Sequence, residues 1–389
     1  MRLITDSAEL AEFCARLATA DFVTVDTEFM RERTYWPRLC LVQLAGPQDA
    51  ACVDPLMPGI DLEPLIKLMY EPRVLKVFHA ARQDLEIFFN LTGRVPAPLF
   101  DTQVAAMVCG FGEAASYETL VNQLAREQID KSMRFTDWAA RPLSDRQIAY
   151  ALADVTHLRV VYQALADRLM KTGRAGWLEE EMATLLDPIT YRTTPEEAWR
   201  RLKPRTARPR VLAVLREVAA WREREAQRRD VPRVRIVRDE ALLEIAVAAP
   251  TTADALARTR GLSQGFAEGR LGQDLLEAVA RGRTMPESEI PTLPPAPVSP
   301  PGIGPIVELL KVLLKIKCEE HHVAPKLVAS SSDLERIASD DDADVPAMKG
   351  WRREVFGLEA LALKHGRIAL SMKGRRIVML DLARAEAAS

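Results

Sequence analysis

The segment 23–29, Val-Thr-Val-Asp-Thr-Glu-Phe, constrains the fold more than any other part of the chain. Its β-branched and apolar residues are typical of a strand that enters a core. Side chains alternate between the two faces of a strand, so Asp26 and Glu28 share one face. Two carboxylates there are costly unless a cation neutralises them, and magnesium prefers oxygen ligands. Alone, the pattern also fits an exposed acidic strand end, and a metal site needs further ligands.

Strand and helix patterns alternate along the N-terminal half. We expect strands at 39–45, 51–54 and 74–78, and helices at 6–20, 62–70, 79–91 and 103–128. This alternation predicts an α/β domain with a mixed sheet covered by helices. The chain has 389 residues, which is too long for one ordinary domain.

The composition is that of a soluble globular protein, with 48% hydrophobic and 28% charged residues. No apolar run approaches the length of a membrane helix, and the N-terminus lacks the shape of a signal peptide. The five cysteines show no Cys-x-x-Cys pairing, which favours buried thiols in a reducing cytoplasm.

Two later segments offer the missing carboxylates. Asp84 opens a helix directly after the strand 74–78, a junction where the active sites of α/β sheets gather. Tyr150 and Asp154 are four residues apart on a predicted helix and therefore share a face. Each also has a structural interpretation: Asp84 as a first-turn acid that complements the helix dipole, and Tyr150 as a core residue beside an exposed Asp154.

Together, the order and spacing of Asp26-x-Glu28, Asp84 and Tyr150-x-x-x-Asp154 resemble the three motifs of the DEDD superfamily of 3′→5′ exonucleases, in its tyrosine branch. The segments 25–31 and 137–143 resemble the ribonuclease D family closely. The resemblance implies a ribonuclease H-like mixed sheet flanked by helices.

The resemblance also implies an exoribonuclease that releases nucleoside 5′-monophosphates from RNA 3′ ends, with transfer-RNA precursors as substrates. Its catalytic residues would be Asp26, Glu28, Asp84, Tyr150 and Asp154. The four carboxylates would bind two divalent metal ions, Mg²⁺ or Mn²⁺, which activate water and stabilise the leaving oxygen. Further candidates, for contacts with the substrate, are Thr27, Phe29, Met30 and His79.

The C-terminal half contains a basic segment and an internal repeat. Arginines outnumber acids over 200–238, which suggests a polyanion partner or a solvated helix face balanced by acids. The segments 231–246 and 323–338 repeat one pattern and resemble HRDC domains, of which ribonuclease D commonly carries two. The tail 367–380 is expected to form a hairpin that turns at Lys373-Gly374.

These patterns predict an N-terminal α/β domain followed by two all-α HRDC-like bundles. The expected segments are an exonuclease domain at 1–190, a first HRDC domain at 205–285, a proline-rich linker at 286–303 and a second, divergent HRDC-like domain at 304–382.

Two other functions fit parts of the pattern: a DNA 3′→5′ exonuclease of the same superfamily, and a non-catalytic RNA-binding scaffold. The chain has no Gly-x-x-x-x-Gly-Lys-Ser/Thr loop, which excludes a P-loop helicase. We expect RNA with a free 3′ end as the partner, no membrane association, and a cytoplasmic monomer.

Overall fold

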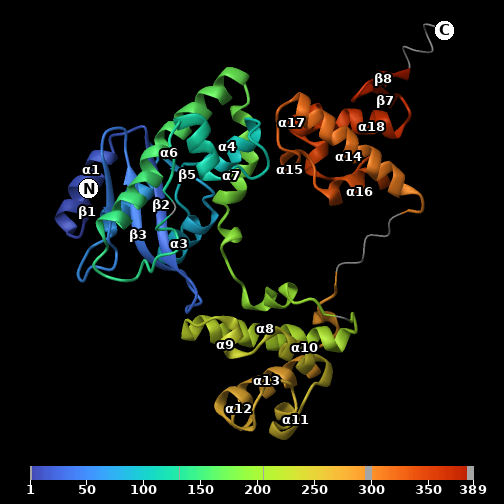
Figure 1. Ribbon diagram of the computed structural model, residues 1–389. Helices are drawn as coiled ribbons and strands as arrows, with labels where there is room; N and C mark the ends of the chain where they lie inside the picture. Colours follow the sequence, from blue (N-terminus) through green and yellow to red (C-terminus); the bar gives the residue numbers. More distant parts are fainter. Residues whose placement is uncertain (1, 131, 205, 294–299, 383–389) are drawn as a thin grey trace.

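The computed structural model comprises an N-terminal α/β domain and two helical regions, shown in Figure 1. It describes all residues except 1, 131, 205, 294–299 and 383–389. We call residues 209–284 the first helical region and residues 303–364 the second. No helix among the described residues is long and apolar enough to cross a membrane.

A six-stranded mixed sheet forms the centre of the N-terminal domain. Its strands are β1 (Leu3–Ile4), β2 (Phe22–Met30), β3 (Arg38–Ala45), β4 (Ala50–Val53), β5 (Leu75–Phe78) and β6 (Leu99–Asp101). They lie in the order β1-β4-β3-β2-β5-β6. The pairs β2–β3 and β3–β4 are antiparallel, whereas β1–β4, β2–β5 and β5–β6 are parallel. The expected α/β class and mixed sheet are therefore confirmed.

Helices cover this sheet, and the longest of them faces the acidic strand β2 (Figure 1). They are α1 (Ser7–Leu17), α2 (Glu63–Met69), α3 (Arg82–Thr92), α4 (Thr102–Val108), α5 (Tyr117–Leu120) with a following π-helical turn (Val121–Ala125), α6 (Asp145–Thr172) and α7 (Glu179–Leu186). The helix expected over 103–128 is interrupted after α4, where Gly110 and Gly112 adopt φ values of 83° and 93°. Such left-handed backbone suits glycine and ends the helix.

The turn between β5 and α3 is organised by Asp101 at the end of β6. Its carboxylate accepts hydrogen bonds from the main-chain N–H groups of Ala80 and Ala81, at 3.0 and 2.9 Å. Ala80 has a φ of 58°, so the helix cannot begin at His79 as expected and starts at Arg82 instead. Asp84 is thereby placed in the first turn of α3, next to the end of the central strands.

The first helical region packs its helices around one apolar core. The helices are α8 (Pro209–Arg229), α9 (Arg233–Ile236), α10 (Asp239–Ala248), α11 (Ala253–Ala257), α12 (Gln264–Glu268) and α13 (Arg270–Thr284). A Cβ atom on Gly282 would lie 2.5 Å from the Cα of Val214, so glycine permits the close approach of α13 to α8. Trp199 and Leu202 join this core from upstream of 205, and the expected boundary there stays a prediction.

The second helical region comprises α14 (Ile303–Glu320), α15 (Pro325–Val328), α16 (Ser331–Ser339), α17 (Gly350–Arg352), a π-helical turn (Arg353–Gly357) and α18 (Leu358–Lys364). The expected hairpin follows as β7 (Ile368–Lys373) and β8 (Arg376–Asp381) and is confirmed. Part of the linker expected at 286–303 lies outside the described residues.

Buried polar and aromatic contacts attach the second helical region to the N-terminal domain. The guanidinium of Arg352, which is 3% exposed, donates hydrogen bonds to Glu180 and Glu181 of α7. Beside it, the rings of Trp177 and Trp351 stack with their centroids 4.1 Å apart. Buried residues of both parts belong to one apolar cluster, so the two parts pack as one unit.

Candidate active site

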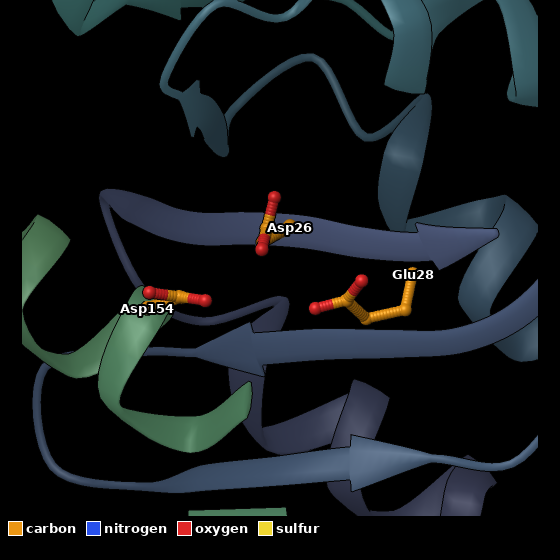
Figure 2. A group of neighbouring side chains, drawn as sticks. All are labelled: Asp26, Glu28 and Asp154. Carbon is orange, nitrogen blue, oxygen red and sulfur yellow. The ribbon is translucent and has the colours of Figure 1, made fainter. Parts of the chain in front are cut away.

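Three carboxylates meet where β2 passes under α6. Asp26 and Glu28 project from one face of β2, and Asp154 projects from α6 toward them (Figure 2). One ligand oxygen of each residue lies within 4.8 Å of those of the other two. The structure therefore brings together three of the four acidic residues that the sequence analysis selected.

The close approach of α6 to the sheet follows from its small residues and from one anchor. Ala151, on the helix face above the sheet, is fully buried. The hydroxyl of Thr24, two residues before Asp26 on the same face of β2, donates to the main-chain oxygen of Val155 at 2.8 Å. This hydrogen bond ties α6 to β2 directly beside Asp154 and sets the spacing of the carboxylates.

Asp84 lies beside the three carboxylates but outside the group of 4.8 Å. It is 6% exposed, and the hydroxyl of Thr27 donates a hydrogen bond to its carboxylate. Burial and the nearby charge of Asp26 raise the pKa of Asp84 well above its usual value. Because the Thr27 hydroxyl already donates its hydrogen bond to Asp84, Thr27 would have to contact a nucleotide through its main chain.

Tyr150 lies one helical turn before Asp154, and its hydroxyl hydrogen-bonds the Asp154 carboxylate. Burial and the charges of Asp154, Glu28 and Asp26 raise the pKa of Tyr150 well above 10. Its ring packs 6.1 Å from that of Trp138, centroid to centroid. The phenol therefore keeps its proton at neutral pH and is held in place from two sides.

In the absence of a cation, burial and mutual repulsion disfavour the ionised form of these carboxyl groups. Burial raises the pKa of Asp26 to about 6, and burial together with the charge of Asp26 raises that of Asp154 to about 8. Burial first, and then the charges of Asp26, Asp154 and Asp84, raise the pKa of Glu28 to about 10. In the described part of the chain, none of these carboxylates forms an ion pair. A cluster of hard oxygen donors with uncompensated charge fits a divalent cation.

A cavity of about 350 Å³ opens beside the carboxylates. It is lined by Asp26, His79, Ser116, Tyr117, Glu118, Ile129, Arg134, Tyr150, Asp154 and Leu158. His79 bonds through Nδ1 to the Thr102 hydroxyl at 3.0 Å, and burial lowers its pKa to about 4, so its ring is neutral. The sequence analysis missed Tyr117, whose hydroxyl donates to the main-chain oxygen of Asp154. No local pattern marks it, because its partner lies on another helix.

A second cavity of about 630 Å³ starts at Glu28. Phe29, Met30 and the segments 32–34 and 134–139 line it. Arg134 lines both cavities, and its guanidinium lies 5.3 Å from the ring centre of Phe135. Phe135 is 91% exposed, which is unusual for so large an apolar side chain. Phe29 and Met30 thus lie beside Glu28 in this second cavity, and their contact with a substrate stays a prediction.

The rest of the loop that carries Phe135 has a structural role. Arg141 donates two hydrogen bonds to the buried carboxylate of Asp54, at 2.6 and 2.7 Å, and a third to the main-chain oxygen of Cys40. Trp138 is 3% exposed. Arg141 and Trp138 therefore anchor the loop, while Arg134 and Phe135 line the cavities.

Much of the basic charge over 200–238 is neutralised within the protein. Arg222, Arg224, Arg228, Arg229 and Arg233 form ion pairs with Asp239, Glu196, Glu225, Glu225 and Glu223 respectively. The charge available to a polyanion is therefore smaller than the count of arginines suggests.

Comparisons with known proteins agree with this geometry. Residues 1–170 match the family model described as 3′-5′ exonuclease, and residues 211–279 match the HRDC domain. The chain is 57% identical over 375 residues to "Ribonuclease D" of Gluconacetobacter diazotrophicus, covering 96% of this chain and 95% of that protein. It is 52% identical to "Ribonuclease D" of Nitrobacter hamburgensis, covering 98% and 100% respectively. The chain belongs to the ribonuclease D family.

A solved structure supports the same assignment. The crystal structure of Escherichia coli RNase D, described as an exoribonuclease involved in structured RNA processing, superposes with a TM-score of 0.79 at 31% identity. The alignment covers 94% of this chain and 98% of the E. coli chain. As a ribonuclease D, the chain is a 3′→5′ exoribonuclease, and its family implies divalent metal ions.

One of the two expected HRDC assignments is confirmed. We expected two HRDC-like bundles, but the family comparison matches one HRDC domain, at residues 211–279. The second helical region carries an acidic loop at 340–344, and an HRDC origin for this region stays a prediction.

Proposed function

We propose that this ribonuclease D hydrolyses the 3′-terminal phosphodiester bond of RNA at the site of Asp26, Glu28 and Asp154, with two divalent cations, Mg²⁺ or Mn²⁺. The products are nucleoside 5′-monophosphates. One observation carries the proposal: three carboxylates from β2 and α6 offer ligand oxygens within 4.8 Å of one another.

Two such cations, when bound, supply hydroxide at neutral pH and stabilise the leaving oxygen. Asp26, Glu28 and Asp154 would hold one cation, and Asp26 and Asp84 would contribute to holding the other. The hydrogen bond from Thr27 restricts the Asp84 carboxylate to one orientation, which prepares it for that task.

Tyr150 acts by orienting the attacking water. Its raised pKa keeps the phenol protonated, so it serves as a hydrogen-bonding group and not as a general base. Asp154 and Trp138 fix the ring on two sides, so the hydroxyl points to the cavity without a loss of rotamer freedom on binding.

The two cavities provide a path for the RNA strand. Phe29 and Met30 contact the terminal nucleotide beside Glu28, and His79 contributes a neutral ring from the other cavity. Arg134 lines both cavities, and its guanidinium would bind a phosphate of the strand. Phe135 offers an exposed ring for base stacking.

The proposed substrate is a structured RNA with a free, single-stranded 3′ end, such as a transfer-RNA precursor. The description of the E. coli relative as an exoribonuclease involved in structured RNA processing supports this choice. The HRDC domain and the second helical region would hold the folded part of the RNA. A monomeric state and a cytoplasmic location remain predictions.

The test uses 5′-labelled RNA with a single-stranded 3′ overhang, a matched DNA, and Mg²⁺, Mn²⁺ or chelator. We expect a ladder that shortens from the 3′ end on RNA and is abolished by chelator and by Asp154→Asn. The matched control is Asp145→Asn, an exposed acid on the same helix, which should leave the ladder unchanged. Shortening that persists in Asp154→Asn would overturn the site, and equal shortening of DNA would overturn the RNA specificity.

A further inference from the structure

Gln43 is a fully buried polar residue in the middle of β3 without a partner for its side chain. Its exposed fraction is 0%, yet neither the oxygen nor the nitrogen of its amide has a hydrogen-bond partner in the described part of the chain. A glutamine amide offers one acceptor and two N–H donors. Buried polar groups almost always pair with protein, water or a ligand, so an unpaired amide points to a partner outside the polypeptide.

The register of the sheet places this amide beside the carboxylates. Gln43 lies directly opposite Asp26 on β2 and directly opposite Cys52 on β4. Residues that oppose each other in adjacent antiparallel strands share a face, with Cβ atoms about 4.5–5.5 Å apart. The Gln43 side chain therefore lies next to that of Asp26, on the face that α6 covers.

The other neighbours of Gln43 on this face offer no hydrogen bonds to it. Leu41, Cys52 and Ala151 are buried, apolar or weakly polar side chains of the cluster around this face. The charges of Glu28, Asp26 and Asp154 reach as far as Cys52, where they add to the effect of burial and raise the thiol pKa. Thr24, on the same face of β2, already directs its hydroxyl to the main-chain oxygens of Ala45 and Val155. Among the described residues, the carboxylates and the groups that they bind are therefore the remaining polar partners near the amide.

We propose that Gln43 is a positioning residue for the metal centre. When the cations are bound, its amide would gain a hydrogen bond to the Asp26 carboxylate or to a water beside it, and this contact would fix the orientation in which Asp26 binds the cations. This inference rests on the two-metal function proposed above and deepens it. Partners of this kind orient ligand side chains, and their removal typically costs 10–100-fold in metal affinity.

The test measures Mn²⁺ binding to the full-length protein by titration calorimetry, without RNA. Gln43→Met removes the amide and preserves the side-chain length, and we expect about tenfold weaker Mn²⁺ binding or more. The thermal midpoint of the metal-free variant should not fall, because the variant loses no hydrogen bond within the protein. The control is Cys52→Ala, in the same row but one strand farther from Asp26, which should bind Mn²⁺ as the wild type does.

The outcomes separate the two proposals. Unchanged Mn²⁺ affinity in Gln43→Met, with a normal wild type, would overturn the role of Gln43 alone. A wild type that binds no Mn²⁺ would overturn the two-metal function and this inference with it. If Gln43→Met does not fold, a crystal structure of the wild type with Mn²⁺ decides. An amide within hydrogen-bond distance of Asp26 or of an ion-bound water supports the role, and an amide paired only with main-chain groups overturns it.

Discussion

The hydroxyl of Tyr35 donates a hydrogen bond to the buried carboxylate of Glu223, which lies 188 residues later in the chain. Tyr35 belongs to the segment between β2 and β3, directly after the strand that carries Asp26 and Glu28. Glu223 belongs to α8 of the HRDC domain and is also bound by Arg233 at 2.6 Å. This hydrogen bond attaches the HRDC domain to the segment between β2 and β3, which borders the second cavity.

Tyr35→Phe should loosen this attachment. The variant removes a hydrogen bond to a charged group, which contributes about 1.5–3 kcal/mol. We expect faster protease cleavage in the segment between α7 and α8, and a larger loss of activity on structured RNA than on a short oligonucleotide. Tyr70→Phe is the matched control, because its hydroxyl bonds only Thr92 and Arg94 within the N-terminal domain. Equal effects of both variants on connector cleavage would contradict the attachment.

The same contact should make the attachment sensitive to acid. Burial alone would raise the pKa of Glu223, but hydrogen bonds from Arg233 and Tyr35 hold it below its usual value. The contribution of Glu223 is therefore fully present above the unfolded pKa of about 4.3 and is lost as the pH falls through the lower folded value. We expect the gap in thermal midpoint between wild type and Glu223→Gln to be wide at pH 7 and to narrow below about pH 4. A gap that does not change with pH would speak against this linkage.

Local patterns in the sequence were sufficient for the elements that carry the site. Alternation over 23–29 predicted β2 and the shared face of Asp26 and Glu28, and the structure confirms both. Ser144 and Gln147 form a capping box at the start of α6, and their spacing of three residues is visible in the sequence. These features depend on neighbours within a few residues, which a sequence displays directly.

Contacts between distant segments were not predictable in this way. The hydrogen bond from Thr27 to Asp84 and that from Tyr117 to the main chain of Asp154 join elements that meet only in the folded domain. The predicted start of α3 was three residues too early, because Asp101 accepts hydrogen bonds from the main chain of the preceding turn and keeps that turn out of the helix. The basic segment left two interpretations open, and the ion pairs of Arg222 with Asp239 and of Arg224 with Glu196 favour the helix face that is balanced by acids outside the segment.

Arg352→Met should detach the second helical region from the N-terminal domain. The guanidinium bonds Glu180, Glu181 and the main-chain oxygen of Leu327, and methionine replaces none of these bonds. A fully buried ion pair costs about 3–5 kcal/mol to break; we expect about 2 kcal/mol here because Glu180 is 59% exposed. Near-ultraviolet circular dichroism of the Trp177–Trp351 stack reports the separation. Arg353→Met, at an exposed neighbour, should leave that signal intact.

Removing one ligand of the proposed metal centre should have opposite effects with and without metal. Without metal, Asp26→Asn should be more stable than the wild type, because it relieves repulsion among buried carboxylates. With Mn²⁺ in hundredfold excess over its dissociation constant, the wild type gains about 2.7 kcal/mol, and the variant should gain almost nothing. Differential scanning calorimetry measures both. Asp167→Asn, an exposed acid of α6, should follow the wild type, and a full Mn²⁺ shift in Asp26→Asn would disprove the ligand assignment.

Phe135 supplies the sharpest test of the proposed RNA path, because its ring is 91% exposed and no packing is lost when it is removed. Base–aromatic stacking contributes about 1–3 kcal/mol per base, so Phe135→Ala should raise KM for single-stranded RNA by about 5- to 160-fold. The turnover number should change little, since the ring does not line the cavity that Asp26 and Asp154 line. Met170→Ala, at a similarly exposed apolar residue near the far end of α6, should alter neither constant. A loss confined to kcat would instead place Phe135 at the reacting phosphate and redirect the strand through the other cavity.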